Sequence, residues 1–293
     1  MNSDAITGSI GAELLLVEES LNKAGTPRPR RHAELIVQTA LELDRTAIYL
    51  NARKILSTEN RSKINELLKR RLEGEPIQYI AGWAPFFGRR FHVYEGVFIP
   101  RFDTELLIER FLGHYNQLPD TNEITRVLDL CCGSGAIGLT IAAEAPRAQV
   151  TLVDISTAAL ECTSINAKSI GVQDSTQLVN WDTLTDPPEN WTHQFDFIVA
   201  NPPYIHVEEV AQLHPDVQRE PHTALTDGGD GLKFYRHWVK ILPKLLVPGG
   251  RLITEIGFNE GQDVSRIISK SFDAVKVFED LNGLPRVVEG KLS

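Results

Sequence analysis

The chain has 293 residues, of which 42% are hydrophobic and 24% are charged, and this ordinary globular composition excludes disordered and fibrous proteins. Its net charge of −9 argues against a duplex-binding protein, because such proteins usually carry a clear basic excess. No segment approaches the roughly 18 apolar residues of a membrane span, and Asp4 and Glu13 stand where a signal peptide needs positive charge, so we expect a cytoplasmic protein without a membrane partner.

The cysteines and histidines indicate neither disulfides nor a metal site. Only three cysteines occur, and two of them, Cys131 and Cys132, are neighbours, which provides neither a disulfide framework nor a Cys-x-x-Cys spacing. The eight histidines form no H-E-x-x-H or related pattern. We therefore expect a reducing compartment and no metal.

The first segment, residues 1–82, is predicted to be a small helical domain. Apolar residues recur there with a period near 3.6 in 10–21, 33–41 and 64–72. The segment is nearly neutral, with 12 basic against 11 acidic residues, whereas the rest of the chain has 18 against 28. Because this domain is separately amphipathic and is joined to the rest by a glycine-rich stretch, we expect it to be a substrate-recognition module.

Residues 83–100 are rich in aromatic and β-branched side chains interrupted by glycines, which predicts a β-hairpin linker. From residue 101 to 293, strand and helix patterns alternate. This alternation predicts an α/β domain with a mainly parallel sheet covered on both faces. The expected strands are 126–130, 150–154, 177–180, 195–200, 251–256, 275–280 and 286–290, and the expected helices begin near Ala136, Thr157, Gly231 and Gly261.

The segment "LDLCCGSGAIG" follows the first of these strands and opens a helix. Gly133 and Gly135 can bring the backbone close to a ligand at the helix N-terminus, and Asp154, which ends the next strand, can accept both hydroxyls of a ribose. The same glycines also fit the G-x-G-x-x-G pattern of dinucleotide enzymes, a weak signal alone. A tight structural turn would explain the glycines as well.

Two further aspartates help to separate these cofactor classes. Asp129 lies just before the glycine turn, where a carboxylate would repel a pyrophosphate but could meet a positively charged amino-acid group. This favours S-adenosylmethionine over NAD. Asp182 ends the third strand, where it could accept from an adenine amino group or simply stabilise a turn.

The fourth strand, "FDFIVA", ends in Asn201-Pro202-Pro203-Tyr204. Two prolines stop a strand and remove two backbone donors, but they keep their carbonyl acceptors. The Asn201 side-chain oxygen and the Pro202 carbonyl can therefore accept both N–H bonds of a planar NH₂ group, which frees its delocalised lone pair for methylation. Tyr204 can stack on that group and hold it in line. A structural Pro-Pro turn is the plainer alternative.

Taken together, these segments resemble the HemK/PrmC-type S-adenosylmethionine-dependent methyltransferases, which modify a glutamine amide in class I peptide chain release factors. The resemblance spans nearly the whole chain and includes "GEPIQYIAGWAPFFG", "FIPRFDTELLIE", "FDFIVANPPYI", "REPHTALTDGGDGLKFYR" and "LVPGGRLITEIG". It implies a Rossmann-like class I methyltransferase sheet, a small N-terminal helical domain and a β-hairpin linker. A monomer acting in translation termination is expected.

Site roles follow from the resemblance by position. It implies that Asp154 holds the cofactor ribose, that Asp182 and Thr183 lie at the adenine, and that the glutamine amide sits at Asn201–Tyr204. The methionine side of the cofactor is assigned to the turn residues Cys131, Cys132, Gly133, Ser134 and Gly135. Cys131 departs from the glycine usual in the family, and Phe102 and Asp103 replace its usual proline and glutamate, while Arg101 and Glu105 remain. We interpret Arg101 as structural or orienting.

Three alternatives stay open at this stage. The first is methylation of a ribosomal-protein glutamine, and the second is N6-adenine methylation of DNA, because a flipped adenine poses the same electronic problem. The acidic charge and the lack of a target-recognition domain argue against DNA. The third is a non-catalytic adaptor, which an intact glycine turn and Asn-Pro-Pro-Tyr corner disfavour.

Overall fold

A computed structural model describes residues 7–119 and 122–293. The chain divides into two compact units. The first comprises the residues up to Trp83 together with His214–Arg219, and the second comprises Ala84–Leu213 and Glu220–Ser293. No helix in the described part of the chain is long and apolar enough to cross a membrane.

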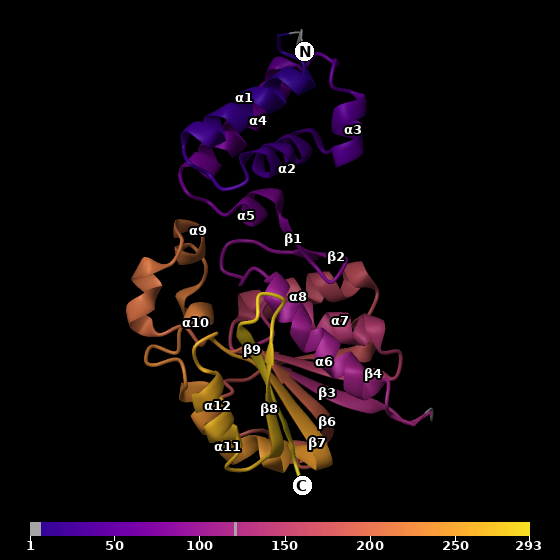
Figure 1. The fold of residues 1–293 in the computed structure, drawn as a ribbon. Coiled ribbons are helices and arrows are strands. Elements are labelled where there is room, and N and C mark those ends of the chain that lie inside the picture. Colours follow the sequence, from indigo (N-terminus) through magenta and orange to yellow (C-terminus); the bar gives the residue numbers. More distant parts are fainter. Residues whose placement is uncertain (1–6, 120–121) are drawn as a thin grey trace. The chain divides into compact units, whose positions relative to one another are not determined.

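The first unit is built from short helices around one apolar core (Figure 1). Its helices are α1 (Ile10–Lys23), α2 (Pro29–Leu41), α3 (Arg45–Leu50), α4 (Thr58–Leu72), α5 (Ile77–Ala81) and α9 (Pro215–Gln218). The three amphipathic segments predicted from the sequence are α1, α2 and α4. On α1, the residues spaced at helical period, Ile10, Leu14, Val17 and Leu21, are all buried, as the pattern requires.

The second unit begins with a hairpin of β1 (Trp83–Phe86) and β2 (Arg89–His92). Phe87 and Gly88 between the strands both have positive φ, 46° and 73°. This geometry is that of a two-residue turn whose twist matches the flanking strands. Short helical turns elsewhere in this unit are η1 (Phe102–Thr104), η2 (Gln173–Ser175), η3 (Glu189–Trp191), η4 (Val207–Gln212) and α10 (His222–Leu225).

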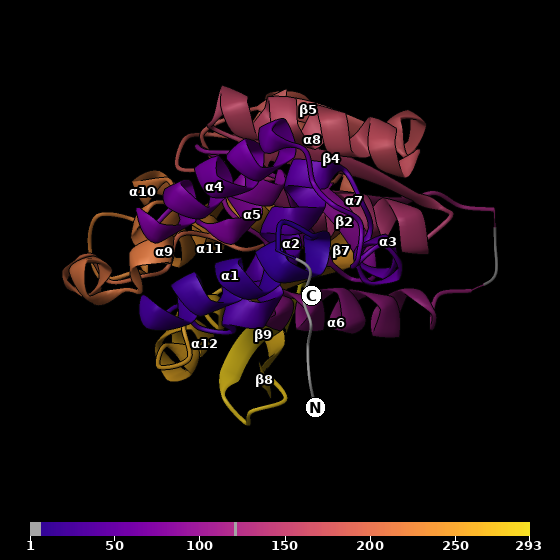
Figure 2. The same cartoon turned by 90° about the horizontal axis from the view of Figure 1, so that it is seen from above.

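A seven-stranded sheet forms the body of the second unit, with β5 at one edge and β8 at the other (Figure 2). The order is β5-β4-β3-β6-β7-β9-β8; the first five strands are parallel, and β9 runs antiparallel to both neighbours. The predicted mainly parallel sheet is confirmed. The strands are β3 (Thr125–Leu130), β4 (Ala148–Asp154), β5 (Thr176–Asn180), β6 (Phe195–Ala200), β7 (Leu246–Glu255), β8 (Asp273–Glu279) and β9 (Pro285–Lys291).

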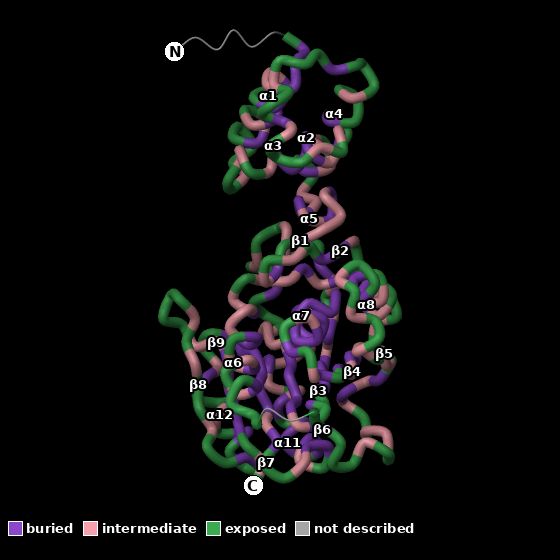
Figure 3. The backbone as a smooth tube through the Cα atoms, turned by 90° about the vertical axis from the view of Figure 1, so that its right-hand side faces the viewer, coloured by how far each residue is buried: buried purple, intermediate pink, exposed green. Residues whose placement is uncertain are grey.

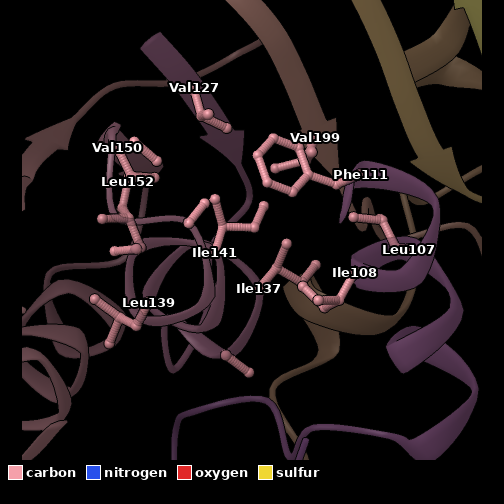
Figure 4. Packing of buried hydrophobic residues seen from close by; sticks show 14 of the residues in the cluster. Leu107, Ile108, Phe111, Val127, Ile137, Leu139, Ile141, Val150, Leu152 and Val199 are labelled. Atoms are coloured by element: carbon pink, nitrogen blue, oxygen red, sulfur yellow. The ribbon is translucent and has the colours of Figure 1, made fainter. Parts of the chain in front are cut away.

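Helices cover both faces of this sheet, so its central strands are buried (Figure 3). On one face, α6 (Glu105–Tyr115), α7 (Ala136–Glu144) and α8 (Thr157–Ile170) pack on Val127 and Val199, and Figure 4 shows α6 and α7 meeting there. On the other face, α11 (Lys233–Leu245) and α12 (Gly261–Ile268) pack on Leu128 and Ile198. Adjacent residues of a strand thus serve opposite faces.

Two differences from the sequence expectation concern the sheet domain most directly, and the short helices α3, α5, α9 and α10 were not expected either. No element was expected over 105–115, yet α6 forms there and buries Leu107, Ile108 and Phe111. Strand β7 begins at Leu246, earlier than the expected 251–256, because it pairs there with Phe195 across a register shift. Long-range pairing, which a local pattern does not reveal, extends the strand through Pro248 and two glycines.

Candidate active site

The strand order reverses between β3 and β6, and the chain leaves both strands at the same level. Leu130 of β3 is paired with Ala200 of β6, and each is the last residue of its strand. The glycine turn that starts at Cys131 and the corner that starts at Asn201 therefore begin side by side. Parallel α/β sheets bind ligands at this switch point, outside the carboxyl ends of the strands.

The turn after β3 is built from residues with left-handed backbone. Cys131, Gly133 and Gly135 have φ of 59°, 57° and 80°. Such a conformation suits glycine but strains a residue with a Cβ, so Cys131 stands where a glycine would be less strained. Burial raises the pKa of the thiols of Cys131 and Cys132, so both stay protonated and are poor nucleophiles.

Asp154, at the end of β4, is joined directly to this turn. Its Oδ2 accepts from the Gly133 N–H at 2.9 Å, and its Oδ1 accepts from the Ser156 N–H at 2.9 Å. Burial raises the pKa of Asp154, and these backbone donors oppose the rise. Each carboxylate oxygen has a second lone pair, so the group can still accept from a ligand hydroxyl.

Asp129 is fully buried, with 0% of its surface exposed, on the α7 side of β3. Its Oδ2 accepts from the Gly138 N–H at 2.8 Å, whereas its Oδ1 has no hydrogen-bond partner among the described residues. Burial raises the pKa of this carboxyl to about 8. A buried carboxylate without a cation is costly, so the site suits a positively charged ligand group.

Asp182 and Thr183 follow β5, which is paired with β4 on the side away from β3. Asp182 Oδ1 accepts from the Leu184 N–H at 2.9 Å, which is the turn-stabilising arrangement that was the plainer interpretation of this residue. Thr183 is buried, and its carbonyl accepts from the indole of Trp238 at 3.2 Å. Its hydroxyl lies 4.0 Å from Cys131 Sγ, at the start of the glycine turn.

At the corner after β6, the amide of Asn201 has a defined orientation. Its Nδ2 donates to the hydroxyl of Thr104 at 3.4 Å, so its Oδ1 is left as the acceptor. Pro202 and Pro203 are buried, and Tyr204 Oη donates to Glu255 Oε1 at 2.9 Å. The Tyr204 hydroxyl is thus directed into the protein, and burial raises its pKa well above the ordinary value.

A loop from the second half of the chain supports this corner. The N–H groups of Ile205 and Val207 donate to the carbonyls of Leu225 and Gly229, each at 2.9 Å. Gly231 packs so closely that a Cβ there would lie 2.1 Å from the carbonyl oxygen of Tyr204. Only glycine fits at this position, so the loop and the corner form one packed unit.

Arg101 and Glu105 hold neighbouring backbone. Arg101 forms an ion pair with the buried Glu220, which also accepts from the Ile99 N–H at 3.0 Å. The guanidinium lies 4.9 Å from the centroid of the Phe98 ring. Glu105 Oε1 accepts from the Phe87 N–H at 2.8 Å. These contacts agree with an orienting role for Arg101.

The structure brings the turn residues, Asp129, Asp154 and the corner to one edge of the sheet, with Asp182 and Thr183 next to Asp154. Sequence reasoning missed Thr104 and Glu255, which contact the corner from 97 and 51 residues away. For Glu255, an acidic residue near the end of the expected strand 251–256 was an available signal; for Thr104 there was none. The described residues contain no group of His, Cys, Asp and Glu that could hold a metal ion.

Comparisons with known proteins agree with this geometry. Residues 14–82 match the PrmC N-terminal domain, and residues 91–284 match the methyltransferase small domain. The release factor glutamine methyltransferase of Neisseria gonorrhoeae is 38% identical over 264 residues, covering 90% of this chain and 93% of the relative. Relatives with that name from Clostridium acetobutylicum and Bacillus subtilis are 36% and 35% identical, and cover 87% and 92% of this chain and 89% and 92% of their own length.

Proposed function

The chain belongs to the family of release factor glutamine methyltransferases, and from this premise we propose its substrate, its cofactor and the roles of its site residues. It transfers a methyl group from S-adenosylmethionine to the side-chain amide nitrogen (N5) of the glutamine in the Gly-Gly-Gln motif of class I peptide chain release factors. The observation that carries this proposal is the pairing of Leu130 with Ala200, which sets the glycine turn beside the Asn201 corner.

The residues at the turn fit S-adenosylmethionine. The unpartnered Oδ1 of Asp129 suits the ammonium of its amino-acid portion and would repel the pyrophosphate of NAD. Asp154 would hold the ribose hydroxyls, Cys131 to Gly135 the methionine side, and Asp182 and Thr183 the adenine region. Ile155, which is 62% exposed directly after Asp154, offers an apolar surface to the base. When bound, the cofactor supplies a methyl group on a sulfonium.

The corner makes the amide nitrogen of the substrate glutamine more nucleophilic. Delocalisation makes this nitrogen a weak nucleophile, and it gives peptide C–N bonds a rotation barrier of about 18–20 kcal/mol. Asn201 Oδ1 and the Pro202 carbonyl accept the two N–H bonds of the substrate, which favours a tetrahedral nitrogen and stabilises the positive charge that develops there. Thr104 keeps the Asn201 oxygen available by accepting from its Nδ2. Tyr204 positions the amide.

Substitution of Asn201 tests this mechanism. Asn201→Ala removes one acceptor, so we expect methyl transfer to release factor to fall roughly 10²–10³-fold, as when one preorganised hydrogen bond is removed from an oxyanion hole. S-adenosylmethionine binding, measured by calorimetry, should change far less. Asn282→Ala, in the exposed turn between β8 and β9, is the matched control. Near wild-type single-turnover transfer by Asn201→Ala would show that the amide-polarising mechanism is wrong.

Mapping of the methylated product tests the substrate. Wild-type protein is incubated with labelled S-adenosylmethionine and, separately, with purified release factor, ribosomal proteins and DNA. We expect label on the release factor glutamine; label on a ribosomal-protein glutamine or on N6 of adenine would replace the substrate that we propose. Labelled release factor would also agree with a protein that acts in the cytoplasm, where translation terminates.

We assign recognition of the substrate protein to the helical residues 1–82. Because His214–Arg219 belongs to the same compact unit, deletion of the helices would also leave that segment without its partners. A sharper test uses the intact chain with two substrates, a whole release factor and a short peptide that contains Gly-Gly-Gln. The peptide should be methylated with a much lower kcat/KM, and equal values would rule this role out.

A further inference from the structure

Glu255 stands next to the Asn201 corner without belonging to it. Strand β7 is paired with β6 through Thr254 and Ala200, so the next residue of each strand, Glu255 and Asn201, follows at the same level. Glu255 is 1% exposed. Parallel neighbours in register point to the same face of a sheet, so the carboxylate of Glu255 lies on the same side as Asn201, the first residue of the corner.

The carboxylate is linked to the last residue of the corner. Its Oε1 accepts from the hydroxyl of Tyr204 at 2.9 Å. Burial raises the pKa of Glu255, and the hydroxyls of Thr104 and Tyr204 and the charge of Arg286 oppose the rise. The first residue of the corner is held separately, by the bond from Asn201 Nδ2 to the hydroxyl of Thr104.

Fold stability alone does not account for this residue. Glu255 Oε2 has no hydrogen-bond partner among the described residues, and a buried carboxylate held mainly by hydroxyl groups costs free energy that an apolar side chain of similar size would avoid. Its backbone carbonyl is held separately, by the hydroxyl of Tyr235 at 2.7 Å. The end of β7 is therefore fixed without the carboxylate.

We propose that Glu255 is a positioning residue for methyl transfer, which holds the ring of Tyr204 through its hydroxyl and thereby keeps the substrate amide in line. This inference rests on the proposed function. Glu255 touches neither substrate nor cofactor in this role. It acts on the orientation of the amide in the transfer step, where a small misplacement is costly.

The expected kinetic signature is a change in kcat without a change in binding. Glu255→Ala should lower kcat for release factor about 10–100-fold, the range seen when an outer-shell partner of a functional ligand is removed. KM for release factor and the calorimetric Kd for S-adenosylmethionine should stay within about threefold. Glu255→Gln should restore most of kcat, because its amide oxygen can accept from Tyr204. Glu279→Ala, exposed at the end of β8, is the control.

A double-mutant cycle separates coupling from general damage. Tyr204→Phe removes only the hydroxyl, so it should lower kcat about as much as Glu255→Ala, and the double variant should be no worse than either single variant. Wild-type kcat in folded Glu255→Ala, an equal loss in Glu255→Gln, or losses that multiply in the double variant would each overturn the proposal. If Glu255→Ala does not fold, Glu255→Leu, an apolar side chain of similar size that cannot accept from Tyr204, forms the same cycle with Tyr204→Phe.

The contact can also be tested without substrate, which separates this inference from the proposed function. Melting temperatures of Tyr204→Phe, Glu255→Leu and their double variant should shift non-additively, because each change removes the same hydrogen bond. Additive shifts would overturn the inferred link. Absence of transfer by the wild-type protein would instead contradict the proposed function and leave the melting cycle to decide whether the two side chains are coupled.

Discussion

A buried carboxylate of the helical unit, Glu34, and two of the sheet unit, Asp129 and Glu255, are treated in opposite ways. In the helical unit, Glu34 is 1% exposed and is surrounded by donors: Arg45 Nε lies 2.9 Å from Oε2, and Tyr49 Oη lies 2.5 Å from Oε1. Burial by itself would raise its pKa, but the hydrogen bonds from Tyr49 and Arg45 and the charges of Arg45 and Arg30 lower it overall. The carboxylate is stable as an anion.

At Asp129 and Glu255 of the sheet unit, burial outweighs the partners, whereas the buried Glu220 of the same unit is paired with Arg101. The pKa of Asp129 rises to about 8, and that of Glu255 is also raised. Each of these two carboxylates has one oxygen without a partner among the described residues. Uncompensated carboxylates are typical of functional sites, since the missing partner can come from a ligand. The contrast with Glu34 supports the functional roles that we propose for Asp129 and Glu255.

The largest effect of a compensated carboxylate on the free energy of unfolding is expected at Glu34. Glu34→Gln removes a charge that accepts several charge-assisted hydrogen bonds, so the free energy of unfolding at pH 7 should fall by about 2 kcal/mol. Because the folded-state pKa is lowered, this stabilisation is fully present above the unfolded value near 4.5 and is lost as pH falls through the folded value. Urea unfolding at pH 7 and pH 3 measures both.

The matched control for Glu34 is Glu59→Gln. Glu59 pairs with Lys63 at 3.0 Å on the surface of α4, where the two side chains are 76% and 54% exposed. The free energy of unfolding of Glu59→Gln should therefore lie within about 0.5 kcal/mol of the wild-type value. Equal losses for the two variants would show that burial of Glu34 adds nothing to its contribution.

The contribution of Asp129 to stability should depend on pH in the opposite way to that of Glu34, and Asp129→Asn should remove this dependence. The raised folded-state pKa means that wild-type stability is greatest below the unfolded value of 3.8 and falls as pH rises towards about 8. The neutral variant lacks this fall, so its free energy of unfolding relative to wild type should rise steadily between pH 5 and pH 8.

The same variant should bind S-adenosylmethionine roughly tenfold or more weakly by calorimetry, because a hydrogen bond to a charged group is worth about 1.5–3 kcal/mol. Higher stability of Asp129→Asn at pH 8 together with weaker cofactor binding would support the contrast between Asp129 and the compensated Glu34. Weaker binding together with a parallel loss of stability at both pH values would contradict it.

The smallest expected change in stability comes from backbone strain, which occurs in both compact units. Cys131 at the turn and Glu42 at the end of α2 have φ of 59° and 53°. At each position the glycine variant should be more stable than the alanine variant by about 1 kcal/mol, because only glycine avoids the left-handed clash. Thermal unfolding of the four variants measures this. A preference for alanine at either position would contradict the strained backbone there.

Local patterns identified most of the fold and the motif part of the site. The period of 3.6 in α1, the apolar run of β6 and the glycines after β3 each depend on neighbours a few residues away, so they are visible in one sequence. For the same reason the sequence alone places Asp154 and Asn201 at strand ends. Helix α6 shows the limit, since its apolar spacing was present but was not assigned.

The sequence by itself determined the helical segment, the alternating α/β domain and the family resemblance, and it predicted the chemistry that we propose for the Asn-Pro-Pro-Tyr corner. Only the tertiary structure decided that β3 and β6 end at one level, that Thr104 orients Asn201, and that Glu255 accepts from Tyr204. It also decided which carboxylates are compensated. The physical reason is that burial and hydrogen-bond partners depend on residues far apart in the chain, as between Glu255 and Tyr204, and no local pattern encodes such contacts.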